Sequence, residues 1–146
     1  MRMKLLTSVF AVGVAALVLS CSSQAGDKAE IDKIAAALRT GDFKGAKKLA
    51  AETAKKVEDF ADVMKLLKEK VKGEKRDGYL VAAVAEIALV MPPEAIGKNK
   101  KVAWASWSEE LRKAGLELAK AKAGPAQKKA TEKLDTVCIS CHNIFK

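Results

Sequence analysis

Hydrophobic residues after Asp27 follow helical spacing almost to the end of the chain. They recur every three or four positions, and glycine or proline falls mostly where these runs stop. Runs of β-branched residues, which favour strands, are absent. The pattern therefore predicts an all-α protein. The expected helices are a short one from Asp27 to Gly41 and longer ones over 42–71, 77–91, 98–123 and 125–146.

The segment 98–123 has the most regular pattern, because its large apolar residues step by three and four from Trp104 to Ala121. Each long helix would carry one apolar stripe that is costly to leave in water. Four such helices joined by short links most simply form an antiparallel up-down bundle. The prediction is therefore a four-helix bundle with a short extra N-terminal helix.

The N-terminal segment differs in composition from the rest of the chain. Met1–Lys4 is basic, Leu5–Leu19 is almost entirely apolar, and the first acidic residue is Asp27. This layout is typical of a secretory signal peptide. The alternative, an uncleaved membrane anchor, is disfavoured because a crossing needs about 20 apolar residues. The protein is therefore expected to be exported, and in a bacterium to be periplasmic.

Two processing sites compete. Cleavage after Ala25 follows the small residues that signal peptidase reads, and would divide the chain into a signal peptide 1–25 and a domain 26–146. Residues 17–21 also resemble a bacterial lipobox, which would make Cys21 a lipidated N-terminus. The sequence leaves both routes open, and membrane attachment is expected only for the second.

The chain has a formal net charge of +9, and loss of Arg2 and Lys4 with the signal would leave +7. A basic surface can steer the protein toward an acidic redox partner or an anionic membrane. The simpler interpretation is that lysines solvate the exposed helix faces. No cluster combines aromatic and basic residues, so nucleic acid is not expected as a partner.

The motif with clear chemistry is Cys138-Ile139-Ser140-Cys141-His142, a C-x-x-C-H sequence typical of c-type haem attachment. On a helix, residues at i, i+3 and i+4 share one face, so both thiols can reach the vinyl groups at one porphyrin edge. His142, the only histidine, would then ligate the iron. The sequence predicts one covalent haem c.

Three other interpretations of the cysteine pair carry less weight. A thiol oxidoreductase usually needs a βαβ pattern, which the sequence lacks. A zinc site would need further ligands that no second Cys/His pair supplies. Two buried cysteines without a role would leave the adjacent histidine unexplained.

The chain resembles the class II cytochromes c, of which cytochrome c prime is the best-known member. The resemblance rests on the mature length, the helical pattern, and a haem motif in the last helix. It covers roughly residues 42–146, and Phe145 matches the family's usual ending, whereas Lys146 stands where arginine is usual. The resemblance implies a four-helix bundle around the haem, with an open distal side or a methionine ligand. Family members often form homodimers.

In an up-down bundle, the haem end of the last helix lies beside the start of the 42–71 and 98–123 helices. The expected pocket residues are Phe43, Leu49, Trp104, Trp107 and Phe145.

Three arrangements are favoured for the sixth position of the iron, and a lysine ligand is a further alternative. It is open beneath an apolar residue such as Leu49, or it is filled by Met91 or by Met64. Met64 would lie toward the opposite end if 42–71 were one straight helix.

The leading functional hypothesis is a periplasmic monohaem cytochrome that transfers single electrons to redox partner proteins. The second is a gas-binding cytochrome that takes up nitric oxide or carbon monoxide at an open iron, and the third is a haem-free helical scaffold. No constellation of catalytic acid, base or nucleophile accompanies the motif, so the protein is not expected to be an enzyme.

Overall fold

A computed structural model describes residues 22–57, 59–71, 76–92 and 98–145. Within these ranges the chain forms six helices and no strand, which confirms the all-α prediction. The signal segment before Ser22, including Cys21, lies outside the described residues. The helices are α1 (Ser22–Arg39), α2 (Phe43–Ala54), α3 (Phe60–Val71), α4 (Gly78–Val90), α5 (Lys98–Lys120) and α6 (Pro125–Phe145).

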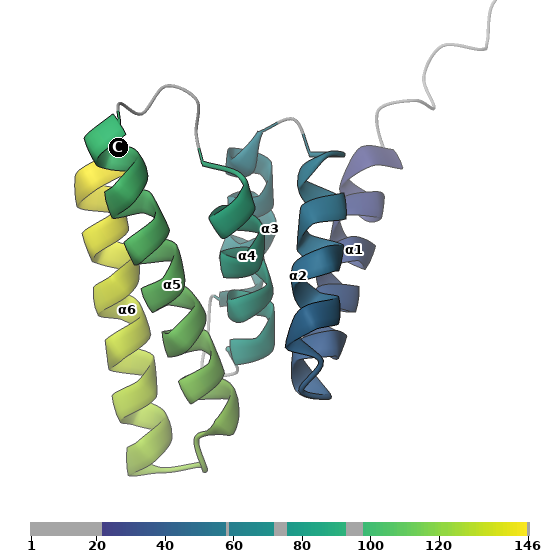
Figure 1. Ribbon diagram of the computed structural model, residues 1–146. Coiled ribbons are helices and arrows are strands. Elements are labelled where there is room, and N and C mark those ends of the chain that lie inside the picture. The colour runs from purple at the N-terminus through teal and green to yellow at the C-terminus, as the bar shows by residue number, and fades with distance from the viewer. Residues whose placement is uncertain (1–21, 58, 72–75, 93–97, 146) are drawn as a thin grey trace, which may run out of the picture.

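Each helix runs antiparallel to the one before it, and α4 lies in the middle of the assembly (Figure 1). It packs against α1, α2, α3 and, most extensively, α5, which in turn packs against α6. The first two helices form a hairpin on the far side of α4 from α6 (Figure 1). None of the described helices is both long and apolar enough to span a bilayer.

The central position of α4 follows from its small and apolar residues. Every residue from Val81 to Ala88 is buried, so the helix is enclosed on all sides instead of along one stripe. Gly78 and Gly115 let α4 and α5 approach closely. A Cβ atom at Gly78 would lie 2.5 Å from the backbone nitrogen of Ala119, and one at Gly115 would lie 2.8 Å from the carbonyl oxygen of Gly78.

The prediction of one continuous helix over 42–71 is wrong, because two helices occupy this segment. The first ends where the amide groups of Lys56 and Val57 both bond to the carbonyl oxygen of Thr53. The second begins after Asp59, whose side chain accepts the backbone N–H of Ala61 at 2.9 Å. The reversal between them buries both Val57 and Phe60.

The prediction of a short N-terminal helix that begins at Asp27 is wrong, because α1 begins at Ser22 and has 18 residues. The remaining boundaries lie close to their predicted places. Asp77 caps α4 by accepting the backbone N–H of Tyr79 at 2.9 Å. Gly41, with φ +80°, separates α1 from α2, and Gly124, with φ +106°, precedes Pro125 at the start of α6. These two glycines adopt the left-handed conformation that other residues avoid.

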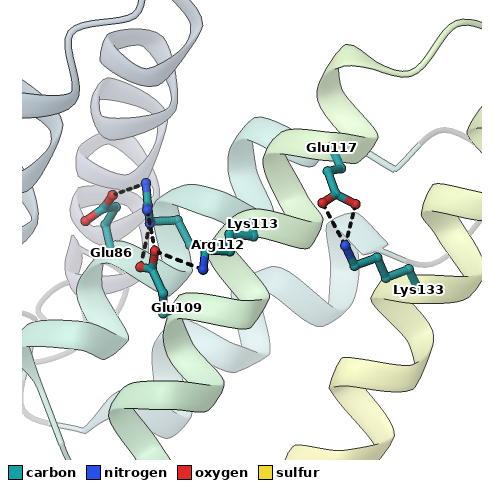
Figure 2. Close-up of polar contacts among 6 residues, drawn as sticks. All are labelled: Glu86, Glu109, Arg112, Lys113, Glu117 and Lys133. Carbon is teal, nitrogen blue, oxygen red and sulfur yellow. Dashed lines mark hydrogen bonds and ion pairs between the residues drawn. The ribbon is translucent and has the colours of Figure 1, made fainter.

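One acidic residue lies inside the apolar interior. Glu86 on α4 is 2% exposed, and its only ion-pair partner among the described residues is Arg112 on α5, at 3.7 Å (Figure 2). Arg112 donates more closely to Glu109, at 2.6 and 2.9 Å. Burial raises the pKa of Glu86, although Arg112 and Lys47 partly oppose this, whereas hydrogen bonds from Arg112 lower the pKa of Glu109.

These opposite shifts predict opposite pH dependences of stability. The stability that Glu86 contributes to the fold is greatest below its unfolded-state pKa. This stability is lost as pH rises through the higher folded-state pKa. Glu86→Gln should therefore gain stability relative to the unsubstituted chain as pH rises, by about 1 kcal/mol at neutral pH. Urea unfolding between pH 4 and pH 8 measures this difference.

Glu109→Gln is the matched control, because the pKa of Glu109 is lowered instead of raised. The stability that Glu109 contributes is present above its unfolded-state pKa and is lost as pH falls through its folded-state pKa. The Glu109→Gln variant should therefore lose stability relative to the unsubstituted chain as pH rises. The same pH trend in both variants would contradict the assignment of the Glu86 shift to burial.

Candidate haem site

The C-x-x-C-H motif lies on the last turns of α6. Cys141 is buried in the apolar stripe of that helix, Cys138 is half-buried beside it, and neither forms a disulfide. His142 is exposed, so its imidazole is not engaged in the core. Two thiols and an imidazole therefore lie on adjoining positions of one helix face, as haem attachment requires.

Burial raises the pKa of both thiols. For Cys138 the nearby Asp135 adds to this effect while Arg76 opposes it, and for Cys141 the pKa rises to about 11. Both thiols are therefore protonated at neutral pH. A disulfide oxidoreductase instead lowers the pKa of its attacking cysteine.

An aromatic cluster adjoins the end of α6. Trp104 contacts Phe60, Trp107 and Phe145, with ring centroids 5.2, 5.2 and 5.1 Å apart. The contacts with Phe60 and Phe145 are nearly perpendicular, at 84° and 80°, which is a favourable edge-to-face arrangement. The structure thus brings three of the predicted pocket residues together beside the motif.

Both tryptophans in this cluster are held by hydrogen bonds to neighbouring helices. The indole nitrogen of Trp104 donates to the carbonyl oxygen of Ala88 on α4 at 2.7 Å. That of Trp107 donates to the carbonyl oxygen of Val137 on α6 at 2.9 Å. These bonds satisfy the buried polar groups and fix the rings, so α4, α5 and α6 meet at one rigid apolar end.

One face of α6 that carries part of the motif is turned toward Arg76, before α4. Asp135, Cys138 and His142 share that face, since they are spaced at i, i+3 and i+7. Asp135 pairs with Arg76, which lies two residues before the start of α4. The side chain of Phe60, at the start of α3, reaches Trp104 of α5.

The break in the 42–71 segment changes which residues lie near the motif. Phe43 is 41% exposed and is the first residue of α2, which begins at the opposite end of the molecule from the end of α6 (Figure 1). Leu49 is in the middle of α2, which packs against α1 and α4. The expectation that Phe43 and Leu49 lie at the haem end is therefore not met.

Phe60 occupies the place expected for these residues, although the helical pattern did not predict it there. The signal that could have revealed it is Asp59, a residue type that favours the position before a helix.

Because the 42–71 segment forms two helices, Met64 lies nearer the motif than one straight helix would place it. Met64 lies one turn after Phe60 on α3, so it is near the motif end and not, as expected for a straight helix, near the other end. Met91 follows α4 and lies three residues beyond Ala88, the acceptor of the Trp104 bond. Both methionines are half-buried against the core.

The residues at this end fit a c-type haem. They provide two unbridged thiols, an imidazole that no core contact occupies, and a fixed apolar wall. The apolar side chains of Ile139 and Ile144, which flank His142 in sequence, are 61% and 46% exposed. An apolar macrocycle is a natural cover for such side chains.

Comparison with known proteins adds no assignment. No protein-family model, curated protein or solved structure matches this chain. Within the described ranges, no three His, Cys, Asp or Glu side chains are grouped as ligands of a single metal ion.

Proposed function

We propose that this protein is an exported monohaem c-type cytochrome that transfers single electrons in the bacterial periplasm. The observation that carries the proposal is the placement of Cys138, Cys141 and His142 on one face of α6, beside a fixed aromatic cluster. When bound, the haem supplies an iron that changes oxidation state by one electron.

The protein residues would hold this group in distinct ways. Cys138 and Cys141 would form thioethers to its two vinyl groups, and His142 would ligate the iron through an imidazole nitrogen. Trp104, Trp107 and Phe145 form an apolar wall that limits access of water. A rigid, dry wall lowers the reorganisation that accompanies electron transfer, and it raises the reduction potential by disfavouring charge.

We further propose that α3, α4, α5 and α6 form the haem-binding four-helix bundle. In this arrangement α6 and α3 would hold the haem, and α1 and α2 are an N-terminal hairpin packed on α4. The bundle thus begins at Phe60, instead of at residue 42. The Phe60–Trp104 contact supports this arrangement, since it joins the start of α3 to α5, and the Arg76–Asp135 pair joins the residues just before α4 to α6.

Met64 is the strongest candidate for the sixth ligand in this arrangement. It is on α3, the helix proposed to face His142, and it lies one turn from the aromatic cluster. Its thioether is a soft ligand suited to haem iron and raises the potential of such centres. Methionine ligation favours electron transfer over gas binding, because it fills the position that a gas would take.

The ferrous protein and its response to carbon monoxide test this function. We expect a low-spin spectrum that carbon monoxide leaves unchanged. Met64→Ala should open the site, giving a high-spin spectrum and carbon monoxide affinity at least tenfold higher. Absorption spectroscopy of the reduced protein with and without the gas measures both changes.

Met91→Ala is the matched control, because it removes the other methionine near the motif and should leave the spectrum low-spin. Transfer of the high-spin phenotype from Met64→Ala to Met91→Ala would reassign the ligand. A high-spin unsubstituted protein that binds carbon monoxide would instead favour the gas-binding function.

A further inference from the structure

One arginine beside the haem motif has a buried donor without an acceptor. The side chain of Arg76 is 21% exposed, and its Nη1 atom pairs with Asp135 of α6. Its Nε atom is buried and has no hydrogen-bond acceptor among the described residues. A buried donor on a charged group is costly to leave unpaired, so the fold by itself does not account for this arrangement.

The ion pair holds Arg76 close to the first cysteine of the motif. Asp135 lies one helical turn before Cys138 on α6. Burial is the main cause of the raised pKa of the Cys138 thiol, and the charges of Asp135 and Arg76 also act on that pKa, in opposite directions. The guanidinium of Arg76 is therefore near the thiol that would carry one edge of the haem.

The unused donors of Arg76 have the geometry that a carboxylate requires. A guanidinium binds a carboxylate most specifically when two N–H groups donate in parallel, and Nε and Nη2 together form such an edge. Asp135 accepts only from Nη1. It is also the only acidic partner of Arg76 among the described residues. The Nε–Nη2 edge is thus left for a second carboxylate.

We propose that Arg76 binds a propionate of the haem through its Nε–Nη2 edge, while Asp135 holds the guanidinium in place. This assignment rests on the proposed haem. The vinyl and propionate groups of a haem belong to different pyrrole rings, so thioethers on α6 direct the propionates toward neighbouring segments. Arg76 comes from such a segment, just before α4. A carboxylate beside an apolar wall is stabilised by a cation, which makes Arg76 a positioning residue for the cofactor.

Binding of haem and of its dimethyl ester tests which group Arg76 holds. The full-length chain with Cys138→Ala/Cys141→Ala can take up added ferric haem without thioethers, and quenching of tryptophan fluorescence measures the affinity. Adding Arg76→Gln should lower the affinity for haem about tenfold, because a charge-assisted hydrogen bond is lost. The same substitution should change the affinity for the ester, which has no carboxylate charge, less than twofold.

The reduction potential of the covalent holoprotein provides a second measurement. Arg76→Gln should favour the ferric form about tenfold, which corresponds to a potential 59 mV lower, because the propionate charge is no longer offset. The substitution also leaves the charge of Asp135 unpaired. The shift is therefore measured in an Asp135→Asn background as well, where we expect it to persist.

Arg39→Gln is the matched control, because it removes the same charge from a neighbouring ion pair. Arg39 of α1 pairs with Asp77, the residue after Arg76, at 3.3 Å and lies over the ring of Tyr79 at 5.1 Å. Its side chain is 54% exposed. Solvent screens such a charge, so haem affinity and the equilibrium between ferric and ferrous protein should each change less than twofold.

Two results would overturn the assignment of Arg76. An equal loss of affinity for haem and for the ester would show that Arg76 stabilises the fold instead of binding a carboxylate. A potential shift that disappears in the Asp135→Asn background would show that Arg76 only offsets Asp135. Both results concern a protein that carries haem, whereas a chain that takes up no haem, covalently or when it is added, would contradict the proposed function together with this assignment.

Discussion

Replacement of both Cys138 and Cys141 by alanine is expected to abolish covalent haem retention, from one haem per chain to none. The two thiols are the only described cysteines, and they lie on one face of α6, so no other described side chain can form the thioether bonds. Mass spectrometry after denaturing extraction measures the change. The unsubstituted mature chain should be heavier than its sequence by one haem.

The neighbouring residues provide the controls for this experiment. His142→Ala should keep the haem attached but change its spectrum, because the thioethers remain and the axial imidazole is lost. Ser140→Ala should keep both the attachment and the spectrum, since the Ser140 hydroxyl only donates to the backbone of Thr136 at 2.9 Å. Circular dichroism of each variant checks that the helices still form.

Two results would contradict the haem proposal directly. One is a colourless protein, produced in a host that matures c-type cytochromes, in which both thiols react with an alkylating reagent. The other is a normal haem spectrum in the His142→Ala variant, which would show that another residue ligates the iron.

Gly78→Ala is expected to cause the largest loss of stability among conservative substitutions in the helices, about 3 kcal/mol or more. The added methyl group would meet backbone atoms of Gly115 and Ala119, which cannot move without separating α4 from α5. This pair has the most extensive helix–helix contact in the described structure. Urea unfolding followed by circular dichroism measures the loss.

Gly45→Ala makes the same chemical change in α2 and serves as the control. Its methyl group would meet only the side chain of Asp42, which is exposed and can rotate away. The gain in helix propensity, about 1 kcal/mol, offsets the loss of the Asp42 cap, which is of similar size. Equal destabilisation by both substitutions would show that close approach of α4 and α5 is not the cause.

Local signals predicted most helix boundaries correctly. Asp77 before α4, Gly41 after α1, and Gly124-Pro125 before α6 act through their own backbone preferences and bonds, which depend little on distant residues. The buried residues of α5 also follow the predicted spacing of three and four, because Trp104, Trp107 and the apolar residues that follow them at this spacing are buried.

Glu86 shows where a local pattern is incomplete. The sequence places one acidic residue in the apolar run of α4, and an exposed position would have been the ordinary expectation. The structure buries it, because α4 is covered on several sides, and places Arg112 of α5 nearby. A partner 26 positions away cannot be deduced from helical periodicity.

The sequence by itself determined that the chain is helical and that two thiols and an imidazole share one face of its last helix. Both properties follow from spacing within a single helix, which is a local geometric rule. The tertiary structure decided which residues accompany them. The chain reversal between α2 and α3 buries Val57 and Phe60, and it brings Phe60 and Met64 to the motif end while Phe43 lies at the other. The helical spacing of apolar residues continues through this reversal, so the sequence pattern does not show where the chain turns. Only packing between segments distant in the sequence shows it.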